Sequence, residues 1–466
     1  MGLDELFHPR SIAVVGVSEE ETKPGTRYLD GLLTAGYKGE IYLVNREGGE
    51  VRGFKVYRSV KEIPHPVDLV SVFIPREGVL ELVKDCCEKG VKGIQFFTAG
   101  FSELDDYGRR LEKEMVKIAK EHGVRIIGPN CIGLSCTRCR MSLGPGGFFG
   151  EEGNVGFISQ SGGFAGLMYN YGNLWGLKFS KVASYGNASD VDDIELLSYL
   201  FDDPDTHYIG AYFEGTRRGR ELFELIKRRV KEKPFVIWKG GRTEEGGETA
   251  LSHTGSMKSS FEVWRALVRQ AGAVESQGIE ETVSVLLAFQ NLPPIRGNRV
   301  LIIAGVIGPG GGMSVISTDI LPSYGLDISP ISDGERRKLE GVLTRLVGTI
   351  RRNPLDLGGV PIKLGDVLEI FSGSDYDIIL IWIPLWYFQE FRGWGEDWER
   401  ASEIIIDFKK SMKKPLALIS PPGFPGDRGR AILKKLFDNG VCVFPSVELC
   451  GKALSSVISY WRRNEG

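Results

Sequence analysis

The chain has 466 residues and a net charge of -3, with 42% hydrophobic and 26% charged residues. These are values of a globular protein, and at ~150 residues per domain the length predicts about three domains. The charge balance argues against a nucleic-acid partner, and no apolar run reaches the ~18 residues of a membrane span. Seven cysteines, an odd number, and no signal-peptide pattern at the start favour a reducing compartment, so we expect a cytoplasmic protein.

Short apolar runs alternate with helical patterns along the whole chain, which predicts parallel sheets covered on both faces. In the first segment the expected strands are 11–17, 39–45, 68–75, 92–101 and 124–130. In the second they are 154–160, 178–186, 207–215 and 234–241, and in the third 298–305, 377–385, 414–420 and 440–446. The sequence therefore predicts an α/β fold with three doubly wound domains, 1–145, 146–293 and 294–466.

The first strand ends in a turn of Gly16, Val17 and Ser18. The dinucleotide fingerprint G-x-G-x-x-G is broken there, because Ser18 replaces its second glycine. The second strand ends in Asn45-Arg46, where an NAD site would have an acidic residue. Arg46 suits a ribose phosphate, as in coenzyme A (CoA) or NADP, although a solvated surface arginine explains it equally well on its own.

The run GNVGFISQSGG, residues 153–163, is a strand–turn–helix pattern. It brings Ser161, Gly162 and Gly163 to a helix start, where unpaired N–H groups bind anions and a Ser hydroxyl adds a donor. The structural alternative is an N-capping serine followed by glycines that serve packing.

His253 lies in a polar, glycine-punctuated stretch, residues 240–260. Most surface histidines are inert, but a neutral imidazole is a nucleophile when a partner holds its other nitrogen. Glu214, at the end of the strand 207–215, is a suitable partner.

Two further patterns are incomplete. The nucleophile-elbow motif of α/β-hydrolases, G-x-S-x-G, is incomplete because Ser159 occupies its first glycine position. Cys131, Cys136 and Cys139 have the spacing of an iron–sulfur site, but no fourth cysteine follows before Cys442. We therefore expect neither a hydrolase nor a cluster.

Many ordered blocks of the chain together resemble the nucleoside-diphosphate-forming acyl-CoA synthetases, in particular the alpha subunits of ADP-forming acetyl-CoA synthetases. The blocks include SIAVVGVS, GYKGEIYLVN, KGIQFFTAGFSE, GPNCIG, FISQSGG, YGNASDVDDIELLSYL, SHTGS and NPLDL. The resemblance covers essentially the whole chain. Succinyl-CoA synthetase alpha subunits share the first two domains but lack the third.

The resemblance implies a Rossmann-like CoA-binding domain followed by two flavodoxin-like domains. It implies the reversible reaction of acyl-CoA, phosphate and ADP to carboxylate, CoA and ATP, with acetate or another short acid as substrate. Phosphate would bind at Ser161, Gly162 and Gly163, and His253, oriented by Glu214, would carry the phosphoryl group on a swinging loop. The residues expected at CoA are Gly16, Val17, Ser18, Asn45, Arg46, Ile74, Pro75, Thr98, Gly100, Asn130 and Cys131.

The resemblance also implies a partner, an ATP-grasp beta subunit in an α2β2 heterotetramer, which would bind ADP or ATP with Mg2+. We expect no metal site on this chain. Two alternatives are a non-catalytic CoA-binding regulatory protein of the same fold and an NADP-dependent oxidoreductase. His253 and Glu214 argue against the first, and the broken fingerprint at Ser18 favours CoA over NADP.

Overall fold

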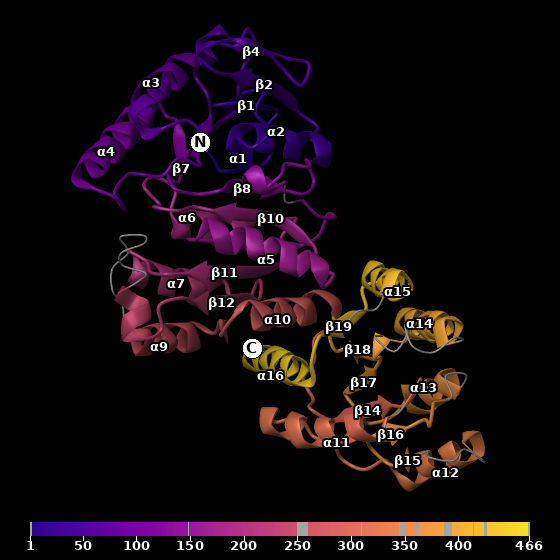
Figure 1. Ribbon diagram of the computed structural model, residues 1–466. Coiled ribbons are helices and arrows are strands. Elements are labelled where there is room, and N and C mark those ends of the chain that lie inside the picture. Colours follow the sequence, from indigo (N-terminus) through magenta and orange to yellow (C-terminus); the bar gives the residue numbers. More distant parts are fainter. Residues whose placement is uncertain are drawn as a thin grey trace. The chain divides into compact units, whose positions relative to one another are not determined.

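The computed structural model describes residues 2–147, 149–248, 260–308, 310–343, 350–359, 363–385, 394–412, 414–423 and 426–464. The chain divides into two compact units, Met1–Ile279 and Glu280–Gly466. The first unit holds two sheets and the second holds one (Figure 1). The division into three domains at residues 145 and 293 stays a prediction.

The first sheet has the strand order β3-β4-β2-β1-β5-β6-β7. Its strands are β1 (Ser11–Val15), β2 (Glu40–Val44), β3 (Gly49–Val51), β4 (Phe54–Tyr57), β5 (Leu69–Val72), β6 (Gly93–Phe96) and β7 (Arg125–Ile127). All neighbours are parallel except the hairpin β3–β4. Because β1 lies between β2 and β5, the strand order reverses there, and ligands of such sheets bind at this switch point.

Helices cover both faces of the first sheet. They are α1 (Asp4–Phe7), α2 (Pro24–Ala35), α3 (Val79–Lys89) and α4 (Asp106–Glu121). Asp105 is the N-cap of α4, and its carboxylate accepts the N–H of Gly108 at 2.6 Å. The α2 and α3 helices each end in a left-handed glycine, Gly36 and Gly90.

The second sheet has the order β13-β12-β11-β9-β10-β8. Its strands are β8 (Gly133–Cys136), β9 (Val155–Ser159), β10 (Phe179–Ser184), β11 (Tyr208–Phe213), β12 (Phe235–Lys239) and β13 (Val274–Ser276), with helices α5 (Gly162–Leu174), α6 (Asp193–Asp202), α7 (Gly219–Arg229) and α9 (Phe261–Ala271). Strands β10-β9-β11-β12-β13 have the flavodoxin order 2-1-3-4-5, with its switch point between β9 and β11. The added edge strand β8 is antiparallel to β10.

The first two sheets are joined by main-chain hydrogen bonds. The segment that follows β10 runs beside the end of β7, where Asn187 N–H donates to the Pro129 carbonyl at 3.0 Å and Val191 N–H donates to Ile126 at 3.2 Å. The carboxyl ends of both sheets are therefore held in one body.

The third sheet has the order β15-β16-β14-β17-β18-β19. Its strands are β14 (Val300–Ala304), β15 (Ile350–Arg351), β16 (Leu355–Asp356), β17 (Ile378–Trp382), β18 (Leu416–Ile419) and β19 (Cys442–Phe444). The helices of this unit are α10 (Ile279–Asn291), α11 (Gly311–Ile320), α12 (Asp333–Val342), α13 (Leu364–Ser372), α14 (Trp394–Ser411), α15 (Gly426–Asp438) and α16 (Val447–Arg463). Apart from the antiparallel edge strand β15, the order is again 2-1-3-4-5.

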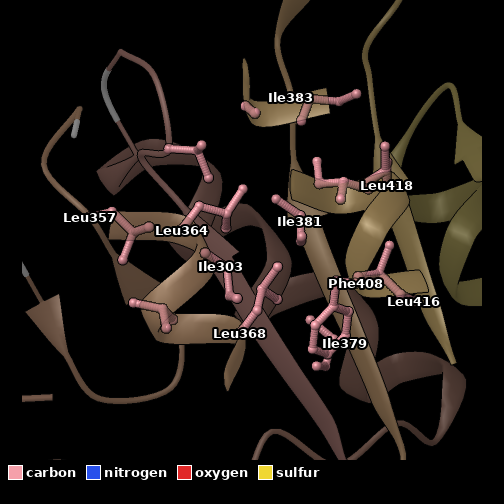
Figure 2. Close-up of a cluster of buried hydrophobic side chains, with 14 of the residues drawn as sticks. Ile303, Leu357, Leu364, Leu368, Ile379, Ile381, Ile383, Phe408, Leu416 and Leu418 are labelled. Atoms are coloured by element: carbon pink, nitrogen blue, oxygen red, sulfur yellow. The ribbon is translucent and has the colours of Figure 1, made fainter. Parts of the chain in front are cut away.

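Figure 2 shows the core on one face of this sheet. Ile379 and Ile381 are alternate residues of β17 and lie on this face. Leu364 and Leu368 of α13 and Phe408 of α14 pack against them. These side chains are buried, and burial of each stabilises the unit by ~1.5–3 kcal/mol. The α/β fold class predicted from the sequence, Rossmann-like and then flavodoxin-like, is confirmed.

Candidate active site

A cavity of about 620 Å³ opens at the switch point of the first sheet. The ends of β1, β2 and β5 form it together with the first turn of α3. Its lining includes the predicted Gly16, Val17, Ser18, Asn45, Arg46, Ile74 and Pro75, and also Arg58, Glu77, Glu81 and Asp85. The structure thus brings together seven of the residues that the sequence assigned to CoA.

The turn after β1 is held by side chains from neighbouring elements. Gly16 has φ +97°, and a Cβ there would lie 2.8 Å from the Phe73 carbonyl oxygen, so that this position requires glycine. Thr26 Oγ donates to the Ser18 carbonyl at 2.8 Å, and Asn45 Nδ2 donates to the Val17 carbonyl at 3.0 Å. Asn45 therefore shapes the loop that a ligand would meet.

Arg46 is the basic residue at the cavity rim. Its side chain is 80% exposed and lies 3.2 Å from the Glu81 carboxylate. An exposed ion pair of this kind contributes ~0–1 kcal/mol, so an arriving phosphate can replace Glu81 at small cost.

A second cavity of about 600 Å³ lies between the first two sheets. It shares Ile74 and Pro75 with the first cavity, so the two cavities adjoin. Its lining includes the predicted Thr98, Asn130, Cys131, Ser161, Gly162 and Gly163 together with Phe73, Phe97, Ile132 and Gln160. The structure therefore brings the expected end of the CoA site next to the expected phosphate loop.

Ser161 is the N-cap of α5, and its Oγ accepts the N–H of Phe164 at 3.4 Å. The capping alternative is thus realised, and it is compatible with anion binding, because the first-turn N–H groups of Gly162 and Gly163 have no partner within the helix. A Cβ on Gly162 would lie 3.1 Å from Ile132 Cγ2, whereas one on Gly163 would meet nothing closer than 3.9 Å. Gly162 serves packing as well, and Gly163 leaves the helix start open.

Cys131 reaches the second cavity as a neutral thiol. Its Sγ is buried, 3.5 Å from the Phe96 carbonyl oxygen, and burial raises the pKa of the thiol to about 12. It therefore does not compete as a nucleophile at neutral pH.

Glu214 follows β11 at the switch point of the second sheet. Its N–H and that of Gly215 both donate to Gln160 Oε1, at 2.9 and 3.0 Å, which ties the end of β11 to the end of β9. Tyr212 donates to Glu214 Oε1 at 3.4 Å. Glu214 Oε2 is buried and has no hydrogen-bond partner among the described residues. Such an oxygen costs free energy unless a donor reaches it.

Two predicted residues stand apart from this arrangement. Gly100 lines neither cavity; its N–H donates to Glu103 at 2.6 Å. His253 lies outside the described residues. The sequence interpretation missed Gln160, although its place between a strand and a Ser-Gly-Gly helix start could have indicated a residue at the carboxyl edge.

In the described part of the chain, no group of three or more His, Cys, Asp or Glu side chains could hold a metal ion. Nor does any helix there combine the length and apolar character needed to cross a membrane.

Two family models match the chain where these cavities lie. A CoA binding domain matches residues 10–137, and a succinyl-CoA ligase like flavodoxin domain matches residues 152–289. A CoA-binding sheet followed by such a flavodoxin-like sheet defines a CoA ligase, an enzyme that joins an acid to a thiol.

Full-length relatives narrow this class. The alpha subunits of acetate–CoA ligases (ADP-forming) I and II from Pyrococcus furiosus are 33% and 39% identical, over 99% and 96% of this chain and 98% and 95% of theirs. The chain belongs to this family of ADP-forming acetate–CoA ligase alpha subunits. A catalytic role fits these relatives, and the alternative of a non-catalytic regulatory protein does not.

A solved structure has the same fold throughout. The acetyl-coenzyme A synthetase 1 of Ca. Korarchaeum cryptofilum, in complex with phosphate and ADP, superposes with a TM-score of 0.83 at 28% identity, covering 99% of this chain and 97% of that one. All three sheets are therefore part of the family's architecture.

Proposed function

We propose that this chain catalyses the acyl-CoA half of the reaction acyl-CoA + phosphate + ADP ⇌ carboxylate + CoA + ATP, with acetate or another short acid. The observation that carries the proposal is that the two cavities adjoin at Ile74 and Pro75. CoA bound with its nucleotide end near Arg46 would reach past these two residues to Ser161. The assignment of CoA to the predicted residues rests on this geometry.

In the first step, phosphate is held at the start of α5 by the N–H groups of Gly162 and Gly163. A phosphate oxygen attacks the thioester carbonyl carbon, the carbon–sulfur bond breaks, and the CoA thiolate leaves and takes up a proton. The products are acyl phosphate and CoA. Fixed N–H donors stabilise charge that develops on oxygen without having to reorganise during the reaction.

In the second step, a nitrogen of the His253 imidazole attacks the phosphorus of the acyl phosphate, and the carboxylate leaves. The unpartnered Oε2 of Glu214 supports a role in holding the other ring nitrogen, because a buried carboxylate oxygen requires a donor. A covalent carrier divides the transfer to ADP into two steps, so that acyl phosphate and ADP need not share one site.

The phosphoryl group then passes to ADP on a separate subunit. We assign ADP and its Mg2+ to an ATP-grasp beta subunit in an α2β2 assembly, supported by the designation of the relatives as alpha subunits. The seven cysteines, none of which is in a disulfide, support a cytoplasmic location.

The test uses the full chain with acetyl-CoA and radioactive phosphate. We expect one acid-labile, base-stable label per chain, as phosphohistidine requires, and none in His253→Ala. His122→Ala, which changes an exposed histidine on α4's C-terminal side, is the matched control and should keep the label. Absence of label in the wild type, or label retained in His253→Ala, would overturn the mechanism.

A further inference from the structure

Cys136 and Cys139 lie in one tight turn. Cys136 ends β8, and the turn of residues 137–140 returns the chain so that Met141 N–H donates to the Cys136 carbonyl at 2.9 Å. Arg140 N–H donates to Thr137 at 3.1 Å across the turn. The turn brings Cys139 Sγ within 3.7 Å of the Cys136 carbonyl oxygen. The two cysteines are therefore neighbours in space as well as in sequence, as a disulfide between them requires.

The two thiol groups influence each other's ionisation. Cys139 Sγ lies 3.7 Å from the Cys136 carbonyl oxygen and 3.3 Å from that of Phe7. The hydrogen bond from Cys139 and the neighbouring His8 together lower the pKa of the Cys136 thiol to about 5, against the effect of burial. The same contact raises the pKa of Cys139. At neutral pH the pair therefore holds one thiolate and one thiol, the form from which disulfide exchange proceeds.

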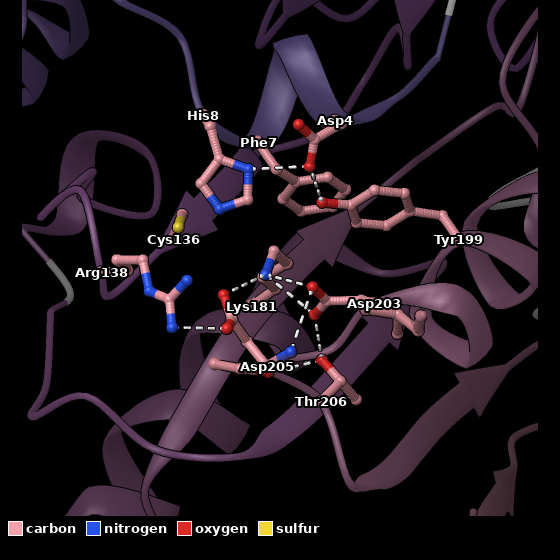
Figure 3. Close-up of polar contacts among 12 residues, drawn as sticks. Asp4, Phe7, His8, Cys136, Arg138, Lys181, Tyr199, Asp203, Asp205 and Thr206 are labelled. Atoms are coloured by element: carbon pink, nitrogen blue, oxygen red, sulfur yellow. Dashed lines mark hydrogen bonds and ion pairs between the residues drawn. The ribbon is translucent and has the colours of Figure 1, made fainter. Parts of the chain in front are cut away.

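Charged groups from three elements surround Cys136 (Figure 3). His8 follows α1 and lies 3.0 Å from Asp4. Lys181 of β10 is opposite Cys136 in the sheet register, but its ammonium group is buried and 2.8 Å from both Asp203 carboxylate oxygens, with Asp205 at 3.3 Å. Because Lys181 is already neutralised, His8 is the neighbour that can respond to the charge on sulfur.

The pair also differs from the other cysteines in exposure. Cys139 is partly exposed, whereas the other six cysteines are buried. The thiols outside the pair all have a raised pKa because of burial; they are Cys86, Cys87, Cys131, Cys442 and Cys450. Reagents in solution therefore meet Cys139 first, with the Cys136 thiolate directly behind it.

We propose that Cys136 and Cys139 form a redox-active dithiol that a small-molecule disulfide converts into an intramolecular disulfide. Cys139 passes its proton to Cys136 and attacks the small disulfide, which forms a mixed disulfide and releases one thiolate. Cys136 returns the proton to that leaving thiolate and attacks Cys139 Sγ, which closes the protein disulfide and releases the second small thiolate. Starting from one thiol and one thiolate, the protein loses one proton and two electrons, and one small disulfide becomes one thiol and one thiolate, which takes a proton from water.

The test incubates the reduced full chain with glutathione disulfide, quenches with acid, and alkylates the remaining thiols in denaturant before mass spectrometry. The seven cysteines of the wild type should fall to five that can be alkylated, with no glutathione retained at the end. Because Arg138 lies between the two cysteines, trypsin separates them into two peptides that the disulfide alone keeps together. The linked pair should contain Cys139-Arg140 and the peptide that ends at Arg138.

Three variants make the result specific. Cys136→Ser should stop at a stable mixed disulfide with glutathione on Cys139, and Cys139→Ser should keep all its thiols. Cys87→Ser, which removes a buried cysteine on α3, is the matched control and should still lose two thiols. Retention of all seven thiols in the folded wild type, or loss of two thiols in Cys139→Ser, would overturn the proposal. Circular dichroism of each variant verifies that it is folded.

Discussion

Glu214 and Asp193 are two carboxyl groups that the second sheet holds in unfavourable surroundings. Each is buried and has one oxygen without a hydrogen-bond partner among the described residues. Both also act on the buried Tyr185, whose pKa burial raises and their charges raise further. Unsatisfied carboxylates cost stability, and such costs concentrate at functional sites.

Glu214→Gln tests whether the Glu214 carboxylate orients the imidazole of His253. The amide keeps the size of the side chain, and the main-chain bonds to Gln160 remain, so the fold should be unaffected. Loss of the charge that orients the imidazole should slow phosphohistidine formation roughly 100-fold, with CoA binding unchanged. Single-turnover labelling with phosphate measures the rate. The exposed Glu224→Gln on α7 is the control; equal rates in both variants would exclude the role of Glu214.

Asp193 predicts a pH dependence of stability. Burial raises the pKa of its carboxyl to about 6, partly offset by a hydrogen bond from Thr216. The folded state therefore holds the proton at a pH where the unfolded chain has lost it, and stability present at low pH is lost as the pH rises through 6. Asp193→Asn should be more stable than the wild type by roughly 2–3 kcal/mol at pH 7, and the difference should shrink toward pH 4.

Urea unfolding of Asp193→Asn between pH 4 and pH 8 measures this difference. Asp106→Asn is the matched control, because Asp106 is the first residue of α4 as Asp193 is of α6, but its side chain is 85% exposed. A pH-independent difference for Asp193→Asn would show that the carboxyl is ionised in the folded protein.

At the scale of elements, the strands that carry the site were predictable, whereas the two edge strands of the second sheet, β8 and β13, were not. Strand β9 and helix α5 follow from a buried apolar run that ends in Ser-Gly-Gly, because both are long enough to show their own pattern. Strands β8 (GLSC) and β13 (VES) are short and contain no continuous apolar run, and each is held by its pairing with β10 or β12. The sequence also could not show that Gln160 ties β9 to β11, since that bond joins residues 54 positions apart.

Ser161→Ala separates the capping role of helix α5 from its role in phosphate binding. Loss of the hydrogen bond that Phe164 N–H donates to Ser161 Oγ should lower the free energy of unfolding by ~1 kcal/mol. The KM for phosphate should rise several-fold, because one donor to the anion is lost. Ser446→Ala removes the equivalent cap of α16, where Ser446 Oγ accepts the Leu449 N–H at 3.2 Å. Ser446→Ala should lower the free energy of unfolding by a similar amount and leave the KM for phosphate unchanged. A KM that rises in both variants would show that Ser161 acts only as a helix cap.

At the scale of the whole molecule, the proposed function uses the switch points of both sheets in the first unit. In that proposal the cavity of the first sheet binds the nucleotide end of CoA and the helix start of the second sheet binds phosphate, with Ile74 and Pro75 lining both cavities. The main-chain bonds between residues 126–130 and 187–191 hold this spacing fixed. Binding energy gained in one cavity can therefore position the thioester in the other.

Arg46→Gln tests this separation of the two ends. If Arg46 binds the 3′-phosphate of CoA, the variant should raise the KM for acetyl-CoA roughly tenfold, the worth of a hydrogen bond to a charged group. The kcat should stay unchanged, because the lost contact stabilises the bound substrate and the transition state equally. With the acetyl thioester of dephospho-CoA, wild type and variant should give the same KM. Arg27→Gln, an exposed change on α2, is the control and should match the wild type with both substrates. A lower kcat in Arg46→Gln, or an equal loss with the dephospho substrate, would mean that the residue acts through the fold of the cavity and not through that phosphate.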